Sequence, residues 1–336
     1  MIGGGTLTPT LSLEARLRAM GVKSLNDKEF AVMIPLVSQD KEVTMDGELL
    51  RHLFHHLFHG TTCRRPRRCA YGDAVVVFIY LLSVLGDRSM RWAYQKRNWP
   101  LWARHLRPPS YSQLMRRLRT SSIQGCMGQL NVAFRNRLPC SAEKVVDGKP
   151  LVVGVYSKDR DARRGCLAQD QWARGYKLHA VVDAAGAVEA AAVTPLNSGE
   201  APVAAKLMEA VNLQGVTVRA DANYDSNSLY EVVAHRGGRL IAPRRKPGRG
   251  LGHHSQHAHR LEAIVILEGE AFARKNHRRH RNRIEQAFAH LTNLPFGLAP
   301  LPNWVRGLAR VTRWVQAKIL IYHLYLSLTR QQAEAA

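Results

Sequence analysis

Three acidic residues stand beside apolar runs, where an unpaired carboxylate costs free energy. Asp147 lies within the valine-rich stretch EKVVDGKPLVVGVY, and Asp221 ends the alternating run in VTVRADANYDS. Glu285 lies in RRHRNRIEQAFAHL, where Ile284 and Phe288 give a predicted helix an apolar face. These contexts favour carboxylates that share a bound cation.

The chemistry that such a set supports is metal-dependent phosphoryl transfer. Two adjacent strand ends would bring Asp147 and Asp221 together, and a helix packed across the sheet would add Glu285. Hard oxygen ligands select Mg²⁺ or Mn²⁺. Two such ions ~3.5–4 Å apart form a clamp for in-line displacement at phosphorus.

Each carboxylate also has an ordinary structural interpretation when it is taken alone. Asp147 is then a turn residue before Gly148, and Asp221 caps the end of a strand. Glu285 is then a surface residue paired with Arg281. The interpretation as a set depends on the order of the three residues in an α/β frame and on the charge of the chain.

The elements that must position these residues lie in the second half of the chain. Residues 176–196, YKLHAVVDAAGAVEAAAVTPL, predict two strands joined by an Asp-Ala-Ala-Gly turn. A helix is predicted over 199–212, and another begins near Ser226 with Asp225 as its cap. Further strands, a basic loop and a long C-terminal helix complete a mixed α/β domain.

The net charge of the chain indicates an anionic partner. Its 336 residues include 49 Lys and Arg against 26 Asp and Glu, a formal net charge of +23. Such an excess predicts binding to nucleic acid or to an acidic membrane surface. The longest apolar run, residues 74–86, is shorter than the ~20 residues that span a bilayer, so it predicts a buried helix.

The cysteines and the N-terminus favour a cytoplasmic location. None of the five cysteines forms a close pair with zinc-site spacing, and their number is odd. Reduced thiols in a cytosolic protein fit this pattern best. No basic segment followed by an apolar core marks a secretory signal at the N-terminus.

A basic region in the first half predicts contact with nucleic acid. Residues 88–142 contain no acidic residue, whereas a solvated face usually mixes signs. The stretch RPPSYSQLMRRLRTSS predicts a helix with Ser110 or Ser112 as its N-cap. Three arginines are expected along the exposed side of this helix: Arg116, Arg117 and Arg119. We expect a helix-turn-helix that contacts phosphates, and a merely solvated basic helix is the alternative.

Six stretches then follow one another along the chain in a specific order. They are VVDGKPLVVGVYSKDRDARRG, ARGYKLHAVVDAAG, AVTPLNSGEAPVAAKLM, RADANYDSNSLY, APRRKP and RNRIEQAFAHL. With them, residues 143–325 resemble bacterial insertion-sequence DDE transposases, the broad group named after insertion sequences four and five. The stretch SYSQLMRRL lies where this group carries its DNA-binding helices.

The resemblance implies an all-α DNA-binding region over residues 1–140 and an RNase H-like catalytic domain over 141–330. It implies that Asp147, Asp221 and Glu285, spaced by 74 and 64 residues, are a DDE triad that binds two Mg²⁺ or Mn²⁺ ions. The implied activity frees a 3′-OH at a transposon end and joins it to target DNA. The implied partners are double-stranded DNA, as terminal inverted repeats and as target, and further copies of the chain.

Basic residues near the triad are candidates for holding phosphates. In this group the helix with the glutamate bears a tyrosine, an arginine and a lysine at set intervals. Arg281 matches the arginine and is expected to support the site, whereas Arg278 and Thr292 stand at the tyrosine and lysine positions. The further candidates for DNA binding are Lys177, Arg244, Arg245 and Lys246.

Two other classes of function share much of this pattern. A non-catalytic, domesticated DNA-binding regulator would not need the triad, which is intact here. A stand-alone RNase H-like nuclease would lack strand transfer and would not need a separate end-binding region. A polybasic membrane-binding protein is a more distant alternative, because no lipidation motif or amphipathic anchor occurs in the sequence.

Overall fold

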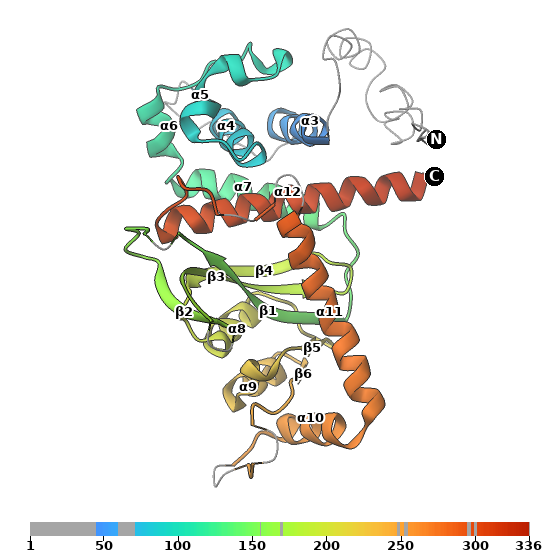
Figure 1. Cartoon of the computed structure of the whole chain (residues 1–336). Coiled ribbons are helices and arrows are strands. Elements are labelled where there is room, and N and C mark those ends of the chain that lie inside the picture. Colours follow the sequence, from blue (N-terminus) through green and yellow to red (C-terminus); the bar gives the residue numbers. More distant parts are fainter. Residues whose placement is uncertain are drawn as a thin grey trace, which may run out of the picture.

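A computed structural model places a layer of helices on a mixed sheet (Figure 1). The residues that it describes are 45–59, 71–154, 156–168, 171–246, 249–251, 255–293, 297–298 and 301–335. The part of the predicted N-terminal region before residue 45 lies outside these ranges. Among the described helices, none is long and apolar enough to pass through a lipid bilayer.

The helical layer is built around α4 (Asp73–Leu85), whose sequence DAVVVFIYLLSVL is apolar on all sides. Every residue of α4 is buried, as expected for a helix that others surround. The other elements of this layer are α3 (Met45–Phe58), α5 (Met90–Tyr94), η1 (Lys96–Asn98), η2 (Leu101–Ala103), α6 (Tyr111–Arg117) and α7 (Ser121–Arg135). Of the two predicted caps, Ser110 begins α6, in a reciprocal capping box with Gln113.

The sheet has six strands in the order β2-β3-β1-β5-β6, with β4 paired to β3 beside β2. Its strands are β1 (Glu143–Val152), β2 (Arg163–Ala168), β3 (Gln171–Asp183), β4 (Val188–Pro195), β5 (Thr217–Arg219) and β6 (Arg239–Ile241). β3 pairs antiparallel with β1, β2 and β4, whereas β5 pairs parallel with β1 and β6. The predicted fold class, an RNase H-like mixed α/β arrangement, is confirmed.

Helices cover both faces of this sheet. They are α8 (Glu200–Glu209), η3 (Ala222–Tyr224), α9 (Asn227–His235), α10 (Ala258–Gly269), α11 (Ala271–Asn293) and α12 (Leu308–Ala335). One face packs against α8 and α9 and forms a separate, smaller core. The other face contacts α11 and α12, and α12 lies between the sheet and the helical layer (Figure 1).

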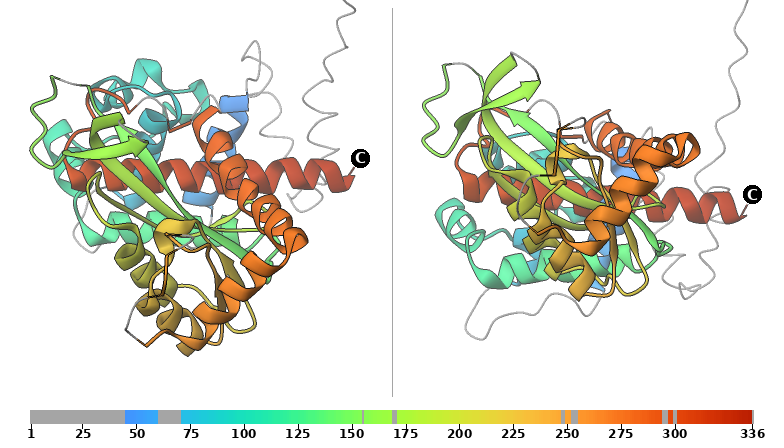
Figure 2. Two further views of the ribbon diagram at one scale, coloured as in Figure 1. Left: turned by 60° about the horizontal axis from the view of Figure 1, so that its bottom comes forward. Right: turned by 90° about the horizontal axis from the view of Figure 1, so that it is seen from below.

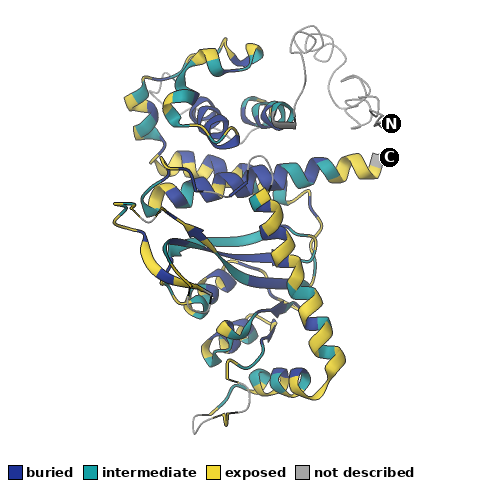
Figure 3. Cartoon of the chain, in the orientation of Figure 1, coloured by how far each residue is buried: buried dark blue, intermediate teal, exposed yellow. Residues whose placement is uncertain are grey.

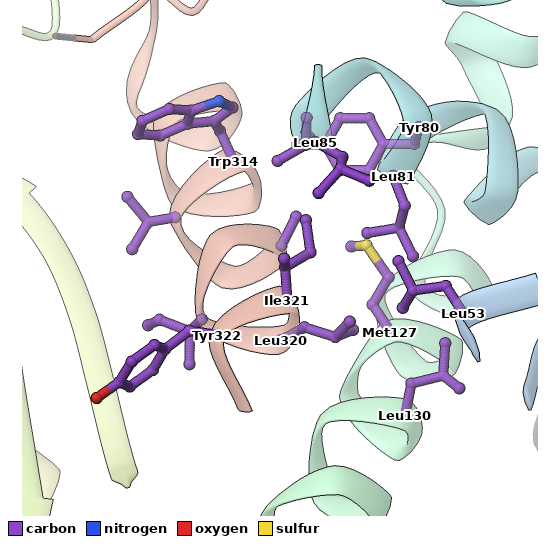
Figure 4. Packing of buried hydrophobic residues seen from close by; sticks show 14 of the residues in the cluster. Leu53, Tyr80, Leu81, Leu85, Met127, Leu130, Trp314, Leu320, Ile321 and Tyr322 are labelled. Carbon is purple, nitrogen blue, oxygen red and sulfur yellow. The ribbon is translucent and has the colours of Figure 1, made fainter. Parts of the chain in front are cut away.

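The larger core is continuous from the helical layer to the sheet. In it, Trp314, Leu320 and Ile321 of α12 face Leu81 of α4 and Met127 of α7 (Figure 4). The predicted boundary between residues 140 and 141 falls between α7 and β1. Because α12 packs on both sides of that boundary, the two predicted domains share one apolar core.

The predicted hairpin is confirmed, and its turn has a clear physical cause. Asp183 Oδ1 accepts hydrogen bonds from the N–H groups of Ala185 and Ala187, at 2.9 and 3.0 Å. Gly186 has a φ of +88°, a conformation that glycine adopts without strain. The turn joins β3 to β4 and fixes their register, which sets the neighbourhood of β1.

Two local expectations are wrong. Asp225 does not cap α9, because Ser226 holds that position, and the Asp225 carboxylate instead receives two hydrogen bonds of 2.6 and 2.7 Å from Arg260. A bidentate arginine satisfies a buried carboxylate better than one backbone N–H does. Cys126 is disulfide-bonded, which contradicts the expectation of reduced thiols for that residue.

Candidate active site

β1 and β5 bring the two aspartates together. Their parallel register pairs Val145 with Arg219, an offset of 74 positions that holds over all three residue pairs. The same offset, two positions further on, relates Asp147 to Asp221. β1 continues beyond this pairing to Asp147, and Asp221 follows the end of β5 by two residues, so both aspartates stand at the same end of two adjacent parallel strands.

A neighbouring backbone N–H orients each aspartate. Asp147 Oδ1 accepts a hydrogen bond of 2.7 Å from the N–H of Gly148. Asp221 Oδ1 accepts one of 2.8 Å from the N–H of Asn223 and thereby caps η3. The strand-end cap considered for Asp221 is therefore present, and its second oxygen, Oδ2, points to the Asn223 amide at 3.3 Å.

α11 brings the third carboxylate and an arginine to this face. Ile284 and Phe288 bury the inner side of the helix in the large core, while its outer side is exposed (Figure 3). Arg281 Nη2 lies 3.6 Å from Asp147 Oδ2 and 3.8 Å from Glu285 Oε1. One guanidinium therefore joins the first and third predicted triad members, although the Glu285 side chain is 61% exposed.

Figure 2 shows α11 alongside the sheet in both views, and the helix contacts β1, β3 and β5. These contacts explain how residues that are far apart in the sequence meet. The two aspartates come from adjacent strands, and the arginine and glutamate come from one turn of the covering helix. The positions predicted as a triad thus share one side of the sheet.

Burial and neighbouring negative charge oppose ionisation of both aspartates. Burial, and after it the charges of Asp221 and Glu200, raise the pKa of Asp147 to about 6, against the lowering by Arg281. Burial, followed by the charge of Glu200, also raises the pKa of Asp221. A divalent cation between the two carboxylates would remove both penalties.

Glu200, the first residue of α8, is a fourth carboxylate that sequence reasoning missed. Its Oε1 lies 2.7 Å from Lys177 Nζ, in an ion pair whose two side chains are 14% and 13% exposed. A Cβ atom at Gly148 would lie 3.3 Å from the same oxygen, so Glu200 approaches the backbone next to Asp147. Acidic residues are ordinary in the first turn of a helix. The feature of the sequence that could have indicated Glu200 was its position in AVTPLNSGEAPVAAKLM, one of the six stretches that carry the resemblance to the transposase group.

Tyr224 is the last residue of η3, the turn that Asp221 caps. Its side chain is fully buried, and its hydroxyl has no hydrogen-bond partner among the described residues. Burial, and then the charges of Glu200, Asp147 and Asp221, raise the pKa of this hydroxyl. Tyr224 therefore holds a neutral hydrogen-bond donor within the field of three acidic residues.

An open cleft of about 630 Å³ lies next to these residues. Gly148, whose N–H donates to Asp147, and Asn223, whose N–H donates to Asp221, line the cleft. Lys177, Glu200 and Arg245 line it as well. The cleft thus carries two cations and one carboxylate beside the residues that hydrogen-bond to the aspartates.

The other predicted phosphate-binding residues divide into exposed and paired ones. Arg245 and Lys246 are exposed. Arg244 is 16% exposed and holds Glu268 of α10 through two hydrogen bonds, one of 2.9 Å from Nη2. Arg245 and Lys246 are accordingly open to solvent, whereas Arg244 ties this segment to α10.

The three arginines of the predicted recognition helix also differ. Arg116 and Arg119 are exposed, as expected. Arg117 is not on the exposed side, since its side chain is 15% exposed and its guanidinium bonds to Asp73. Its Nη1 also donates to the carbonyl of Tyr71 at 2.7 Å. Burial of Asp73 at the start of α4 requires a partner, and Arg117 supplies it.

The acidic residues fit a divalent ion in part. Asp147 and Asp221 offer carboxylate oxygens, the ligand type that Mg²⁺ and Mn²⁺ prefer. The pKa of each carboxyl is raised. Within the described parts of the chain, no group of three or more His, Cys, Asp or Glu side chains is placed to hold a metal. Glu285 contacts Arg281 instead, at 3.8 Å.

Comparison with known proteins defines the class. Residues 142–324 match the family described as the transposase DDE domain, which covers more than half of the 336 residues. The chain therefore belongs to this family, and it is a transposase. Members act on DNA and use divalent metal ions.

Two further comparisons complete the picture. A solved structure of the piggyBac transposase synaptic complex with hairpin DNA is similar at 10% identity, with a TM-score of 0.41 over 95% of this chain and 76% of that one. A similarity this distant assigns no functional role to any residue of this chain. No curated protein sequence matches the chain.

The burial of Asp147, together with the charges of Asp221 and Glu200, predicts that Asp147→Asn stabilises the metal-free protein. The raised pKa of Asp147 means that the folded state binds more protons than the unfolded state between about pH 4 and 6. The free energy of unfolding therefore falls as pH rises through this window. Asparagine retains an acceptor for the Gly148 N–H and removes the charge. We expect a gain of about 2 kcal/mol at pH 7.5 that vanishes near pH 4, measured by urea unfolding with EDTA.

Asp159→Asn is the matched control for this measurement. The burial of Asp159 is outweighed by hydrogen bonds from the Tyr176 hydroxyl and the Gly307 N–H, which lower its pKa. Stability from such a group is present above its unfolded pKa, so this variant is expected to lose stability at pH 7.5. A loss of stability for Asp147→Asn at the same pH would contradict the destabilising effect of a buried, charged Asp147.

Proposed function

We propose that Asp147, Asp221 and Glu285 are the catalytic triad of this transposase and hold two Mg²⁺ or Mn²⁺ ions. The observation that supports this best is the parallel pairing of β1 with β5, since Asp147 lies in β1 and Asp221 follows the end of β5. The contact of Arg281 with both Asp147 and Glu285 adds the third member. The reaction is cleavage at the ends of a transposable element, followed by strand transfer into target DNA.

The side chains divide the work of that reaction. Bound divalent ions would stabilise negative charge on the phosphate and make water a stronger nucleophile at neutral pH. Asp147, Asp221 and Glu285 supply the oxygen donors for them. Arg281 holds Asp147 and Glu285 toward one another in the metal-free protein, which limits the rearrangement on metal binding.

Bond changes follow from in-line displacement at phosphorus. In cleavage, a water oxygen bonds to phosphorus, the bond from phosphorus to the 3′ oxygen breaks, and that oxygen leaves as the 3′-OH. In strand transfer, this hydroxyl attacks a target phosphodiester, and another 3′ oxygen leaves. One bond forms and one breaks in each step, so a single acidic site serves both.

DNA reaches the site across two basic surfaces. Arg245 and Lys246 stand near the mouth of the cleft and would hold phosphates close to the carboxylates. Arg116 and Arg119 of the helical layer would hold the terminal inverted repeat away from the reaction. We further propose that two or more copies assemble on paired ends and that the protein acts in the cytoplasm, at the nucleoid.

The test is a cleavage and joining assay on linear duplex DNA that carries the sequences flanking the gene. We expect Mg²⁺-dependent release of 3′-OH ends and covalent joining of these ends to a supercoiled target. Shuffled flanks of equal length are the control. Cleavage without joining would instead identify a nuclease, and binding without either product would identify a regulator.

The two exposed arginines at the end of α6, Arg116 within it and Arg119 just after it, give a separate prediction for DNA binding. Arg116→Ala with Arg119→Ala is expected to weaken binding to the element end and to reduce the slope of log affinity against log salt by about two units, roughly 0.9 for each phosphate contact. Lys206→Ala with Arg330→Ala removes the same charge from other helices and should leave the slope unchanged. Fluorescence anisotropy over a salt series measures both. An unchanged slope in the α6 variant would remove that helix from the DNA interface.

A further inference from the structure

The Lys177–Glu200 pair lies against the backbone beside the proposed metal site. Lys177 and Gly148 are placed near one another by the antiparallel pairing of β1 with β3. A Cβ atom at Gly148 would lie 3.0 Å from Lys177 Cδ and 3.3 Å from Glu200 Oε1. Glycine at this position therefore lets an ion pair approach the strand that carries Asp147.

The Lys177–Glu200 ion pair does not satisfy all the hydrogen-bonding groups around it. Glu200 Oε1 bonds to Lys177 at 2.7 Å, but Glu200 Oε2 is buried and has no partner among the described residues. The hydroxyl of Tyr224, in a fully buried side chain, is likewise without a partner in the described ranges. A buried polar group without a partner is costly, so two in one place indicate a site built for something other than stability.

Glu200 lies close to both aspartates. Its Oε1 lies 3.3 Å from the position of a Cβ atom at Gly148, the residue after Asp147, and its helix α8 contacts β1 and η3, the turn that Asp221 caps. The geometry thus combines four features: a glycine that admits the pair, an unused carboxylate oxygen, an unused hydroxyl and two aspartates within electrostatic range.

We propose that Glu200 is a fourth acidic residue of the active centre, and that its charge, opposed by Lys177, sets how strongly Asp147 and Asp221 attract a divalent cation. The proposal rests on the cation site of the proposed function. Glu200 strengthens that attraction as an added negative charge, and Lys177 weakens it as an added positive one. Both act through the field and do not need to touch the ion.

Opposite signs distinguish this role from a structural one. Glu200→Gln and Lys177→Gln break the same buried ion pair, so a purely structural pair would give losses in the same direction for both. A field effect gives weaker cation binding for Glu200→Gln and stronger binding for Lys177→Gln. Coulomb interaction of one charge with a divalent ion several Å away predicts changes of about tenfold at high dielectric.

The experiment is a Mn²⁺ titration of the full-length protein without DNA at pH 7.5, with free Mn²⁺ followed by electron paramagnetic resonance. We expect about tenfold weaker binding for Glu200→Gln and several-fold tighter binding for Lys177→Gln. Glu200→Asp keeps the charge and should stay within about threefold of the unsubstituted protein. Glu209→Gln and Lys206→Gln, on exposed positions of α8, are the matched controls and should not change the affinity.

Asp147→Asn distinguishes failure of the proposed cation site from failure of the proposed role of Glu200. If Asp147→Asn does not weaken Mn²⁺ binding, the cation site of the proposed function is refuted. If it does so while Glu200→Gln has no effect, or while the Glu200 and Lys177 variants shift the affinity in the same direction, the role of Glu200 is refuted and the triad stands. Should Glu200→Gln fail to fold, the Lys177→Gln and Glu200→Asp results decide: unchanged or weaker binding in the former overturns the proposal.

Discussion

Asp221→Asn is expected to abolish cleavage and joining of element-end DNA in Mg²⁺ while leaving DNA affinity nearly unchanged. In the unsubstituted protein Asp221 Oδ1 accepts a hydrogen bond of 2.8 Å from the Asn223 N–H. Asparagine retains an oxygen that can accept this bond, so η3 should persist. It removes the charge of the aspartate that follows β5, the strand that pairs with β1. The variant therefore changes the charge of the site with little change in its shape.

The expected loss of cleavage rate follows from the contribution of a bound metal ion to the reaction. Metal-assisted stabilisation of a phosphoryl transition state is worth several kcal/mol. Since each 1.36 kcal/mol is a tenfold change in rate, we expect a fall of about a thousandfold or more. Product formation on labelled end DNA, followed on sequencing gels, measures the rate. Anisotropy in EDTA measures binding.

Glu231→Gln is the control for this prediction. It removes the same charge from an exposed position on α9, next along the chain from η3. Both activities should remain in this variant. Cleavage that survives Asp221→Asn at more than about a tenth of the original rate would refute the triad, because such a loss is below the several kcal/mol that a metal ligand supplies.

The sequence was sufficient to predict the elements that carry Asp147 and Asp221. Valine-rich stretches gave the strands, and the Asp-Ala-Ala-Gly turn gave the hairpin between β3 and β4. The alignment of the two aspartates could not be predicted, because a parallel register depends on contacts between distant segments. The separation of 74 residues acquires its meaning once β5 is known to pair with β1 at the same offset.

The elements and residues that were missed have a common physical cause. β2 reads RRGCLA, which has no strand periodicity, and it forms because β3 pairs with it. Glu200 resembles an ordinary first-turn acid until the fold brings it to Lys177 and Gly148. Arg117 resembles its exposed neighbours until α4 presents Asp73. In each case a tertiary partner decides, and local sequence does not contain it.

Asp73→Ala is expected to be the most destabilising of these substitutions, with a loss of about 3–5 kcal/mol, because it leaves Arg117 charged and without its carboxylate in a largely buried position. Asp73 is 3% exposed and receives hydrogen bonds from Arg117 and from the Ser122 hydroxyl. It also stands in the first turn of α4, where a negative charge is favourable. One side chain thus ties the starts of α4 and α7 to the end of α6.

A double-mutant cycle identifies the ion pair as the cause. Arg117→Ala alone should also destabilise, and the double variant should lose clearly less than the sum of the two, since neither charge is then left unpaired. The urea midpoints of the four proteins give the coupling. Arg116→Ala serves as the control, with a change in stability within about 0.5 kcal/mol. Additive losses would show that the two side chains stabilise the fold independently.

The same variants separate folding from DNA binding in the helical layer. Arg116 is exposed and should contribute to the salt dependence of DNA binding, whereas Arg117 should contribute to stability. If Arg117→Ala leaves the urea midpoint unchanged and reduces the salt slope by about one unit, Arg117 is a phosphate contact and its pairing with Asp73 gives way to DNA. If the slope is unchanged and the midpoint falls, the arginine-rich stretch contains two different functions at neighbouring positions. Its acid-free composition then reflects DNA binding at Arg116 and Arg119, and a buried ion pair at Arg117.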